Sequence, residues 1–222
     1  MKRALAPALA ACLLAGSWAA RADDLYPGAS TYLDFGRYRV PLRYPDGDHQ
    51  AHIGKLGVAY SLPLGGDVSG GLQGGYTVLD VAGEPQPAPV SFDGRFLGLA
   101  LRYEGSEGDH FDLFGEFTYT WHDVDGSRFQ APRSEITWYE TWLAVGPVFR
   151  YARLRLMLGG YYQYLQGSET DTQPARLLDF HSPRRAGAYL GAAVYLDPAN
   201  SIGLRLTGGA QQGVRLEFRR EF

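Results

Sequence analysis

Histidine and serine side chains beside acidic residues are the first candidates for chemistry in this sequence. His122 precedes Asp123, and His181 precedes Ser182, so each pair sets a base next to a carboxylate or a nucleophile. Neighbours along an extended strand point to opposite faces, so neither pair forms a dyad unless the chain bends there. Asp80, Asp125 and Asp179 are further polar residues that are expected near the same end of the fold. Loop polarity explains all of them, and no catalytic residue is predicted.

The other histidines and the paired glycines match neither a metal site nor a phosphate loop. His49 and His52 are close in sequence, but no cysteine or clustered carboxylate completes a ligand set. All five histidines, His110 included, are expected to be solvated loop residues. No Gly-Lys-Ser/Thr follows any glycine pair. The pairs are Gly65-Gly66, Gly70-Gly71, Gly74-Gly75, Gly159-Gly160 and Gly208-Gly209. Neither a metal nor a cofactor is predicted.

A larger group of charged residues lies in segments where apolar and polar residues alternate. Within each segment these charges occupy the polar positions, which all point to the same face of a strand. The group is Lys55, Arg102, Asp112, Glu116, Glu140, Arg155, Arg205, Arg215 and Glu217. It holds five cations and four anions, so its charge is nearly balanced. If this parity faces an enclosed interior, the charges must pair, because an unpaired buried charge is costly. A small barrel has little room beyond its own side chains, so a salt-bridged lumen is expected, with a narrow water-filled lumen as the alternative.

The elements that must position these charges are strands. In the segment 111–122 the odd positions are mostly apolar or aromatic, while the even positions include Asp112, Glu116 and His122. Similar segments are expected as strands at 29–41, 51–62, 70–81, 92–104, 110–122, 136–150, 153–166, 185–196, 201–209 and 212–222. After residue 22 no apolar run approaches the roughly 18 residues of a transmembrane helix. The sequence predicts an all-β fold, a closed antiparallel transmembrane β-barrel of about ten strands, with eight as the alternative.

The connections and the aromatic residues give this barrel an orientation. Short turns at 63–69, 105–109, 151–152 and 197–200 alternate with longer segments at 42–50, 82–91, 123–135 and 167–184, and only 208–211 is short on the long side. In outer-membrane barrels the short turns face the periplasm. Two aromatic girdles are expected, one of Tyr60, Tyr103, Phe111 and Phe149 near the short turns, and one of Tyr76, Tyr119, Trp121, Tyr139, Tyr162 and Tyr164 near the long segments.

The first residues are expected to be a signal peptide rather than part of the barrel. Met1-Lys2-Arg3 is basic, an apolar stretch follows, and Ala20-Arg21-Ala22 fits a cleavage site, which gives a signal peptide over 1–22 and a barrel domain over 23–222. A lipobox-like Leu9-Ala10-Ala11-Cys12 is the rival interpretation, although the apolar run continues past Cys12. The mature part carries 18 basic and 24 acidic residues, a net charge of −6, which argues against a nucleic-acid partner.

The C-terminal residues resemble the terminal signal of Gram-negative outer-membrane β-barrel proteins. Leu216, Phe218 and the final Phe222 alternate with polar residues, and only Arg220 departs from the pattern. The resemblance implies recognition by the outer-membrane assembly machinery and a location in the bacterial outer membrane after export through the periplasm. Outer-membrane lipid and lipopolysaccharide are expected partners. Arginines suited to lipopolysaccharide phosphates are Arg128, Arg133, Arg176, Arg184 and Arg185.

The function expected from these observations is non-enzymatic. An envelope-structural role, or display of loops to a surface or envelope protein partner, comes first. A narrow channel for ions or small solutes is the second hypothesis, and an outer-membrane lipid hydrolase or surface protease is the third. A symmetric hairpin about residue 107 further predicts that Arg102 and Asp112 face each other inside the barrel.

Overall fold

Eleven strands run through the residues that the computed structural model describes, which are 28–82, 90–105, 111–127, 133–172 and 175–222. The strands are β1 (Ser30–Tyr44), β2 (Gly47–Gly65), β3 (Val68–Ala82), β4 (Val90–Glu104), β5 (Phe111–Ser127), β6 (Arg133–Tyr151), β7 (Leu154–Thr172), β8 (Ala175–His181), β9 (Ala186–Tyr195), β10 (Asn200–Gly209) and β11 (Gln212–Glu221). The predicted signal peptide, 1–22, and His110 lie outside the described residues. In the described ranges, no helix has the length and apolarity needed to cross a membrane.

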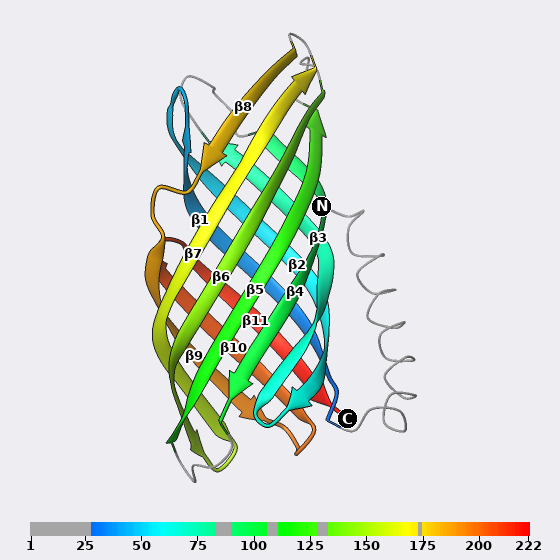
Figure 1. Ribbon diagram of the computed structural model, residues 1–222, viewed down its shortest axis with the longest axis vertical. Helices are drawn as coiled ribbons and strands as arrows, with labels where there is room; N and C mark the ends of the chain where they lie inside the picture. The colour runs from blue at the N-terminus through cyan, green and yellow to red at the C-terminus, as the bar shows by residue number, and fades with distance from the viewer. Residues whose placement is uncertain (1–27, 83–89, 106–110, 128–132, 173–174) are drawn as a thin grey trace.

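Ten of these strands close into an antiparallel ring (Figure 1). Consecutive strands pair from β1 to β7, β7 pairs with β9, and β11 returns to pair with β1 from Ser30–Glu221 to Arg39–Gln212. The amide of Gly28 donates to the carbonyl of Phe222 at 2.6 Å, so both ends of the barrel domain lie at the same rim. The prediction of a closed antiparallel barrel with ten strands in its ring is confirmed.

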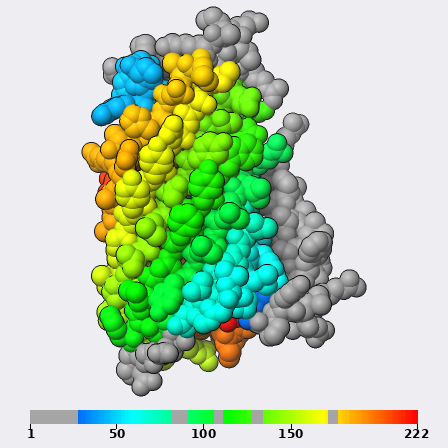
Figure 2. All heavy atoms as spheres, in the orientation of Figure 1, coloured from blue at the N-terminus to red at the C-terminus, as the bar shows by residue number. Residues whose placement is uncertain are grey.

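The strand β8 was not expected from the sequence. It lies inside the segment 167–184, which was predicted as a loop, and it pairs with the upper part of β7. On its other side it meets β1 at the bridge between Arg43 and His181. Above the ends of β9–β11, β8 therefore stands between β7 and β1. Figure 2 shows β8 and the β1–β2 hairpin at the end of the barrel away from the short turns.

Two further segments expected to be long loops are mostly strand. The segment 42–50 is a tight hairpin, because β1 continues to Tyr44 and β2 starts at Gly47. Within 123–135, β5 continues to Ser127 and β6 starts at Arg133. These strands rise well above the level at which β9–β11 end (Figure 1).

The register of the β4–β5 hairpin also differs from the expected one. Arg102 stands opposite Glu116 instead of Asp112. The symmetric hairpin about residue 107 is wrong because the recorded pairs, from Asp93–Asp125 to Glu104–Phe114, centre the hairpin on residue 109. The slip from 112 to 116 is an even number of residues, so Arg102 and Asp112 keep the inward faces that the alternation predicted.

The strands have two zones of opposite polarity. In the lower zone, here called the membrane zone, outward side chains are exposed and apolar. They include Leu97, Leu99, Leu101, Leu143, Val145, Leu156, Leu158, Leu190, Leu204 and Leu206. Exposed tyrosines stand above and below this band, among them Tyr60 and Tyr103 toward the short turns and Tyr119 and Tyr139 toward the other end. Such a belt between aromatic girdles suits a bilayer.

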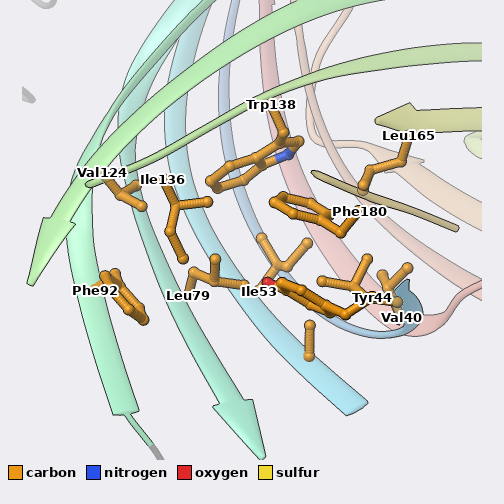
Figure 3. Packing of buried hydrophobic residues seen from close by; sticks show 12 residues of the cluster. Val40, Tyr44, Ile53, Leu79, Phe92, Val124, Ile136, Trp138, Leu165 and Phe180 are labelled. Carbon is orange, nitrogen blue, oxygen red and sulfur yellow. The ribbon is translucent and has the colours of Figure 1, made fainter. Parts of the chain in front are cut away.

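The upper zone, here called the collar, has its apolar side chains inside. The ring of buried residues is Val40, Leu42, Tyr44, Ala51, Ile53, Leu79, Phe92, Val124, Ile136, Trp138, Leu165 and Phe180. Figure 3 shows these side chains directed toward one another within the circle of strands. Most outward positions of the collar are polar, as at Asp125, Glu135 and Gln166, although Leu177 of β8 is exposed. The collar is therefore built like a small water-soluble barrel on top of a membrane barrel.

Candidate functional site

The centre of the membrane zone is occupied by Glu116, a carboxylate with 2% exposure. Three guanidinium groups surround it. Its Oε2 accepts a hydrogen bond from Arg205, and its Oε1 lies 3.3 Å from Arg102 and 3.6 Å from Arg215. Even residues of β5 face the lumen, which explains why Glu116 points to the barrel axis. One anion thus ties together arginines from β4, β10 and β11.

Two more carboxylates balance these arginines. Glu217 lies 3.2 Å from Arg102 and 3.0 Å from Arg215. Asp34 of β1 lies 3.7 Å from Arg215. The guanidinium of Arg102 also rests on the ring of Tyr32, with 3.9 Å between the guanidinium carbon and the ring centroid. The middle of the lumen is therefore a neutral lattice of three arginines and three carboxylates.

A second layer lies above this lattice, where the collar begins. Lys55 donates to Glu140, and Gln163 donates to the other oxygen of Glu140 at 2.9 Å. The same Gln163 amide group donates to the side-chain oxygen of Gln211 at 3.1 Å. Gln211 belongs to the β10–β11 turn, where the positive φ of Gly209 lets the chain fold inward. The connection 208–211, which the sequence marked only as short on the side of the long segments, thus helps to fill the barrel.

His122 sits at the boundary of this layer and was misinterpreted from the sequence. It was expected to be a solvated loop residue, yet it is 0% exposed. Its ring stacks on Trp138 at 4.2 Å between centroids, and its Nε2 lies 3.6 Å from Glu140. The reason is that β5 continues past it, so its even position faces the interior instead of water.

A third layer lies toward the short turns. Arg150 contacts Glu104 at 2.8 Å and Asp112 at 3.1 Å, and Arg155 contacts the other oxygen of Glu104 at 2.5 Å. This is where Asp112 finds its partner, in place of the expected Arg102. An open vestibule of about 490 Å³ adjoins the layer, lined by charged residues that include Arg102, Glu217 and Arg219.

The bore narrows above the vestibule. Beside the lattice residues lies a cavity of about 60 Å³, bordered by Tyr38, Lys55, Gln73 and Glu140. This is the size of a few water molecules. Beyond it the collar core fills the interior with apolar side chains. The vestibule lies on the side of the short turns, where Pro63 and Gly66 border it.

The nine lumen charges expected from the sequence all lie on inward faces. The structure brings Arg102, Glu116, Arg205, Arg215 and Glu217 into one cluster, Lys55 and Glu140 into a second, and Asp112 and Arg155 into a third. Three members of these clusters were missed, namely Asp34, Glu104 and Arg150. Glu104 and Arg150 share the parity of Arg102 and Glu140, so the alternation could have identified them. Asp34 lies on the first strand, which is one of the two strands with the weakest alternation.

The residues considered for hydrolysis do not meet in a catalytic arrangement. Ser182 is buried, and its hydroxyl donates to the carbonyl of Arg184 at 2.8 Å. His181 is exposed, and Asp123 contacts Arg95 at 3.6 Å. His49 contacts Asp46 at 3.1 Å. Within the described ranges, no group of three histidine, cysteine or acidic residues is placed to hold a metal ion.

The residues of the expected assembly signal lie at the seam where β11 meets β1. Phe218 is exposed on the outer face, and Leu216 has the same parity. The amide of Phe222 donates to the carbonyl of Ala29 at 2.9 Å, and Arg220 lies over the Phe222 ring at 5.0 Å.

Polar turns beyond the membrane zone have local electrostatics of their own. In the turn between β9 and β10, hydrogen bonds from Asn200 and from the amide of Ala199 hold the pKa of Asp197 below its ordinary value. In the β1–β2 hairpin, hydrogen bonds from Arg43 lower the pKa of Asp48. Both carboxylates are therefore ionised at neutral pH and fasten their turns.

Comparisons with known proteins agree on the architecture. No protein-family model matches the chain, and no curated protein matches it significantly. The transport unit of the autotransporter AIDA-I from Escherichia coli is similar with a TM-score of 0.50 and 12% identity, over 88% of this chain and 90% of that one. The translocator domain of the autotransporter NalP from Neisseria meningitidis has a TM-score of 0.48 and 14% identity, over 96% of each chain. The outer-membrane protease OmpT from Escherichia coli has a TM-score of 0.48 and 8% identity, over 88% and 97%. At these identities the likeness concerns the fold alone.

Proposed function

We propose that this protein, a transmembrane β-barrel of the Gram-negative outer membrane, is closed to ions and solutes and serves as a rigid base for a surface collar. Its role is then non-enzymatic, in envelope structure or in contacts with other surface molecules. The observation that carries the proposal is the collar core. The apolar side chains of the collar core pack together above the salt-bridged lattice, which supports a lumen too narrow for a hydrated ion.

The paired charges of the lattice also support a barrel that is closed to ions. An ion channel needs polar groups that can exchange their partners with the passing ion. Glu116 and Glu140 instead hold fixed cations, and both are almost fully buried. Moving an ion past them would separate buried ion pairs, which is costly at low dielectric.

The collar supplies the surface for contacts outside the membrane. Its outward residues on β3–β6 are mainly acidic, namely Asp80, Asp93, Asp123, Asp125 and Glu135. Strand-based walls hold these carboxylates more firmly than free loops would. A basic surface of a neighbouring envelope or surface protein is the partner that this face would suit.

The test is single-channel recording of the refolded full chain in planar bilayers. Silence is expected after insertion has been verified by protection of the membrane zone from protease. As a matched control, a variant with Trp138→Ala and Phe180→Ala, which thins the plug, should leak more than the parent. Discrete steps from the parent protein would overturn the proposal in favour of a channel. Release of fatty acid from lipid A or cleavage of peptides would overturn it in favour of an enzyme.

A further inference from the structure

Exposed arginines lie where the three short strands β9, β10 and β11 end below the collar. This change in the height of the barrel wall is here called the step. Arg37 and Arg39 project outward from β1, directly after the exposed Phe35. Arg184 and Arg185 lie in the connection from β8 to β9 and are exposed as well. The four residues carry no acidic partner in any contact of the described chain that the structure records.

The pairing of the strands places the two arginine pairs on either side of one turn. Arg39 stands opposite Gln212, the first residue of β11. The amide of Ala210, in the same β10–β11 turn, donates to the carbonyl of Ala186, which follows Arg185. Between β1 and β9 lie β11 and β10, so the two arginine pairs are about three strand spacings, roughly 14 Å, apart.

Arg185 fixes the height of this step relative to the bilayer. Its guanidinium lies 5.0 Å from the ring centroid of Tyr164 and 3.5 Å from the hydroxyl of Tyr162. Both tyrosines belong to the girdle nearer the collar, where aromatic rings mark the headgroup level. Directly below, the outward face of β9–β11 is apolar, with Leu190, Leu206 and Val214 exposed to the hydrocarbon.

The charge of this face contrasts with the rest of the collar. On β3–β6 the outward side chains that the structure describes at comparable height are mainly acidic, and Arg95 among them contacts Asp123. Repulsion of anionic headgroups on that side and attraction at the step would orient the barrel among anionic lipids.

We propose that Arg37, Arg39, Arg184 and Arg185 form a binding site for the phosphorylated headgroup of lipopolysaccharide in the outer leaflet. Each planar guanidinium suits bidentate contact with phosphate oxygens. The spread of the two pairs fits a headgroup that carries a phosphate at each end, and the acyl chains would lie along the apolar face of β9–β11. The site goes beyond the closed-barrel function and does not depend on it.

The test is lipid binding by the refolded full chain in detergent, with bisphosphorylated lipid A as the probe. Retained lipid A is counted by native mass spectrometry, and the shift in thermal unfolding is measured in parallel. A variant with all four arginines changed to glutamine should bind lipid A at least about tenfold more weakly, since each exposed contact contributes up to about fivefold. A matched control with Arg95→Gln, Arg153→Gln and Arg220→Gln changes exposed arginines elsewhere and should stay within about twofold of the parent.

Three outcomes would overturn the site. Equal loss in the control variant would mean that net charge, and not this cluster, holds the lipid. Equal binding of dephosphorylated lipid A would mean that the acyl chains alone are recognised. Saturation by inorganic phosphate at the same concentrations as lipid A would mean that the cluster is a phosphate site without lipid preference. Heat-modifiable migration of each variant confirms folding, so lost binding cannot come from an unfolded barrel.

Discussion

The membrane zone and the collar share the walls of β1–β7 but solve opposite solvation problems. In the membrane zone, lipid solvates apolar residues such as Leu99 on the outside, so the charges are inside and must pair with one another. In the collar, water solvates Asp125 and Glu135 on the outside, so apolar residues such as Leu165 fill the inside. On β5 the polarity inverts between His122 and Val124, and on β6 between Glu140 and Trp138.

This difference shows which forces hold each zone. The interior of the membrane zone depends on ion pairs whose partners come from strands far apart in sequence, as with Glu116 and Arg205. Removing one partner there leaves a buried charge behind. The interior of the collar depends on packing, so removing a side chain there leaves a cavity. The two zones therefore predict different responses to substitution.

The largest effect is expected from Glu116→Ala in the membrane zone. Loss of this carboxylate leaves three arginines around an empty position, so unfolding should become easier by about 3–5 kcal/mol, read as a lower urea midpoint. Adding Arg205→Ala should restore part of the loss, because it removes one uncompensated charge. Glu135→Ala, an exposed carboxylate of the collar, is the control and should change stability by less than about 0.5 kcal/mol. If the double variant lost as much stability as Glu116→Ala alone, the result would contradict a lattice that is held by ion pairs.

Leu165→Ala should have the next largest effect, because Leu165 is 1% exposed in the collar core. We expect a loss of about 2–5 kcal/mol from the lost transfer energy and the cavity. Leu99→Ala is the matched change in the membrane zone, where lipid can fill the space, and should cost clearly less. Urea unfolding of both variants in the same lipid measures the difference. Equal losses would mean that the collar is not a packed core.

Substitution of outward residues by arginine tests at which level the outer wall changes from apolar to polar. Leu99→Arg places a charge on the lipid-facing wall and should cost about 2–4 kcal/mol near the bilayer midplane. Thr137→Arg places the same charge on the outer wall of the collar and should cost about 0–1 kcal/mol. The comparison uses refolding in lipid vesicles and reads the urea midpoint. A large penalty at Thr137 would place the collar inside the bilayer.

Most of the ten strands that form the barrel ring could be predicted from the sequence. The alternation of apolar and polar residues along one strand is a local property, so it can be recognised without knowledge of the neighbouring strands. The parity of Phe111, Leu113 and Phe117 against Asp112 and Glu116 already separates the lipid face from the lumen face. The collar was missed for the same reason. On β5 most apolar residues occupy odd positions before His122, and the apolar residue after it occupies an even position. In the sequence this exchange resembles the end of a strand. Segments that are strands were therefore expected to be loops.

The candidate site shows the same division between local and global information. Inward parity assigns Arg102 and Glu116 to the lumen, but it does not say which charges meet. Partners depend on the stagger of neighbouring strands, which put Glu116 opposite Arg102 and left Asp112 to Arg150. Contacts across the lumen, such as Lys55 with Glu140, depend on the closure of the whole ring. Neither stagger nor closure can be obtained from a single strand pattern.

The smallest effect is expected at the outer tip, where Arg43 donates to both oxygens of Asp48 at 2.7 and 3.0 Å. These bonds lower the pKa of Asp48 in the folded protein, so their contribution exists above the ordinary aspartate pKa and is lost as the pH falls through the lowered value. Water surrounds both groups, so the difference between the parent and Asp48→Asn should be slight at neutral pH and disappear in acid. Hydrogen exchange of the hairpin amides is the suitable measurement, because the global midpoint should not move. Arg43→Gln is the control and should match Asp48→Asn at neutral pH, while the two changes together should add nothing further. A large fall in the global urea midpoint would contradict this expectation. It would mean that the Arg43–Asp48 pair is essential for the stability of the whole collar.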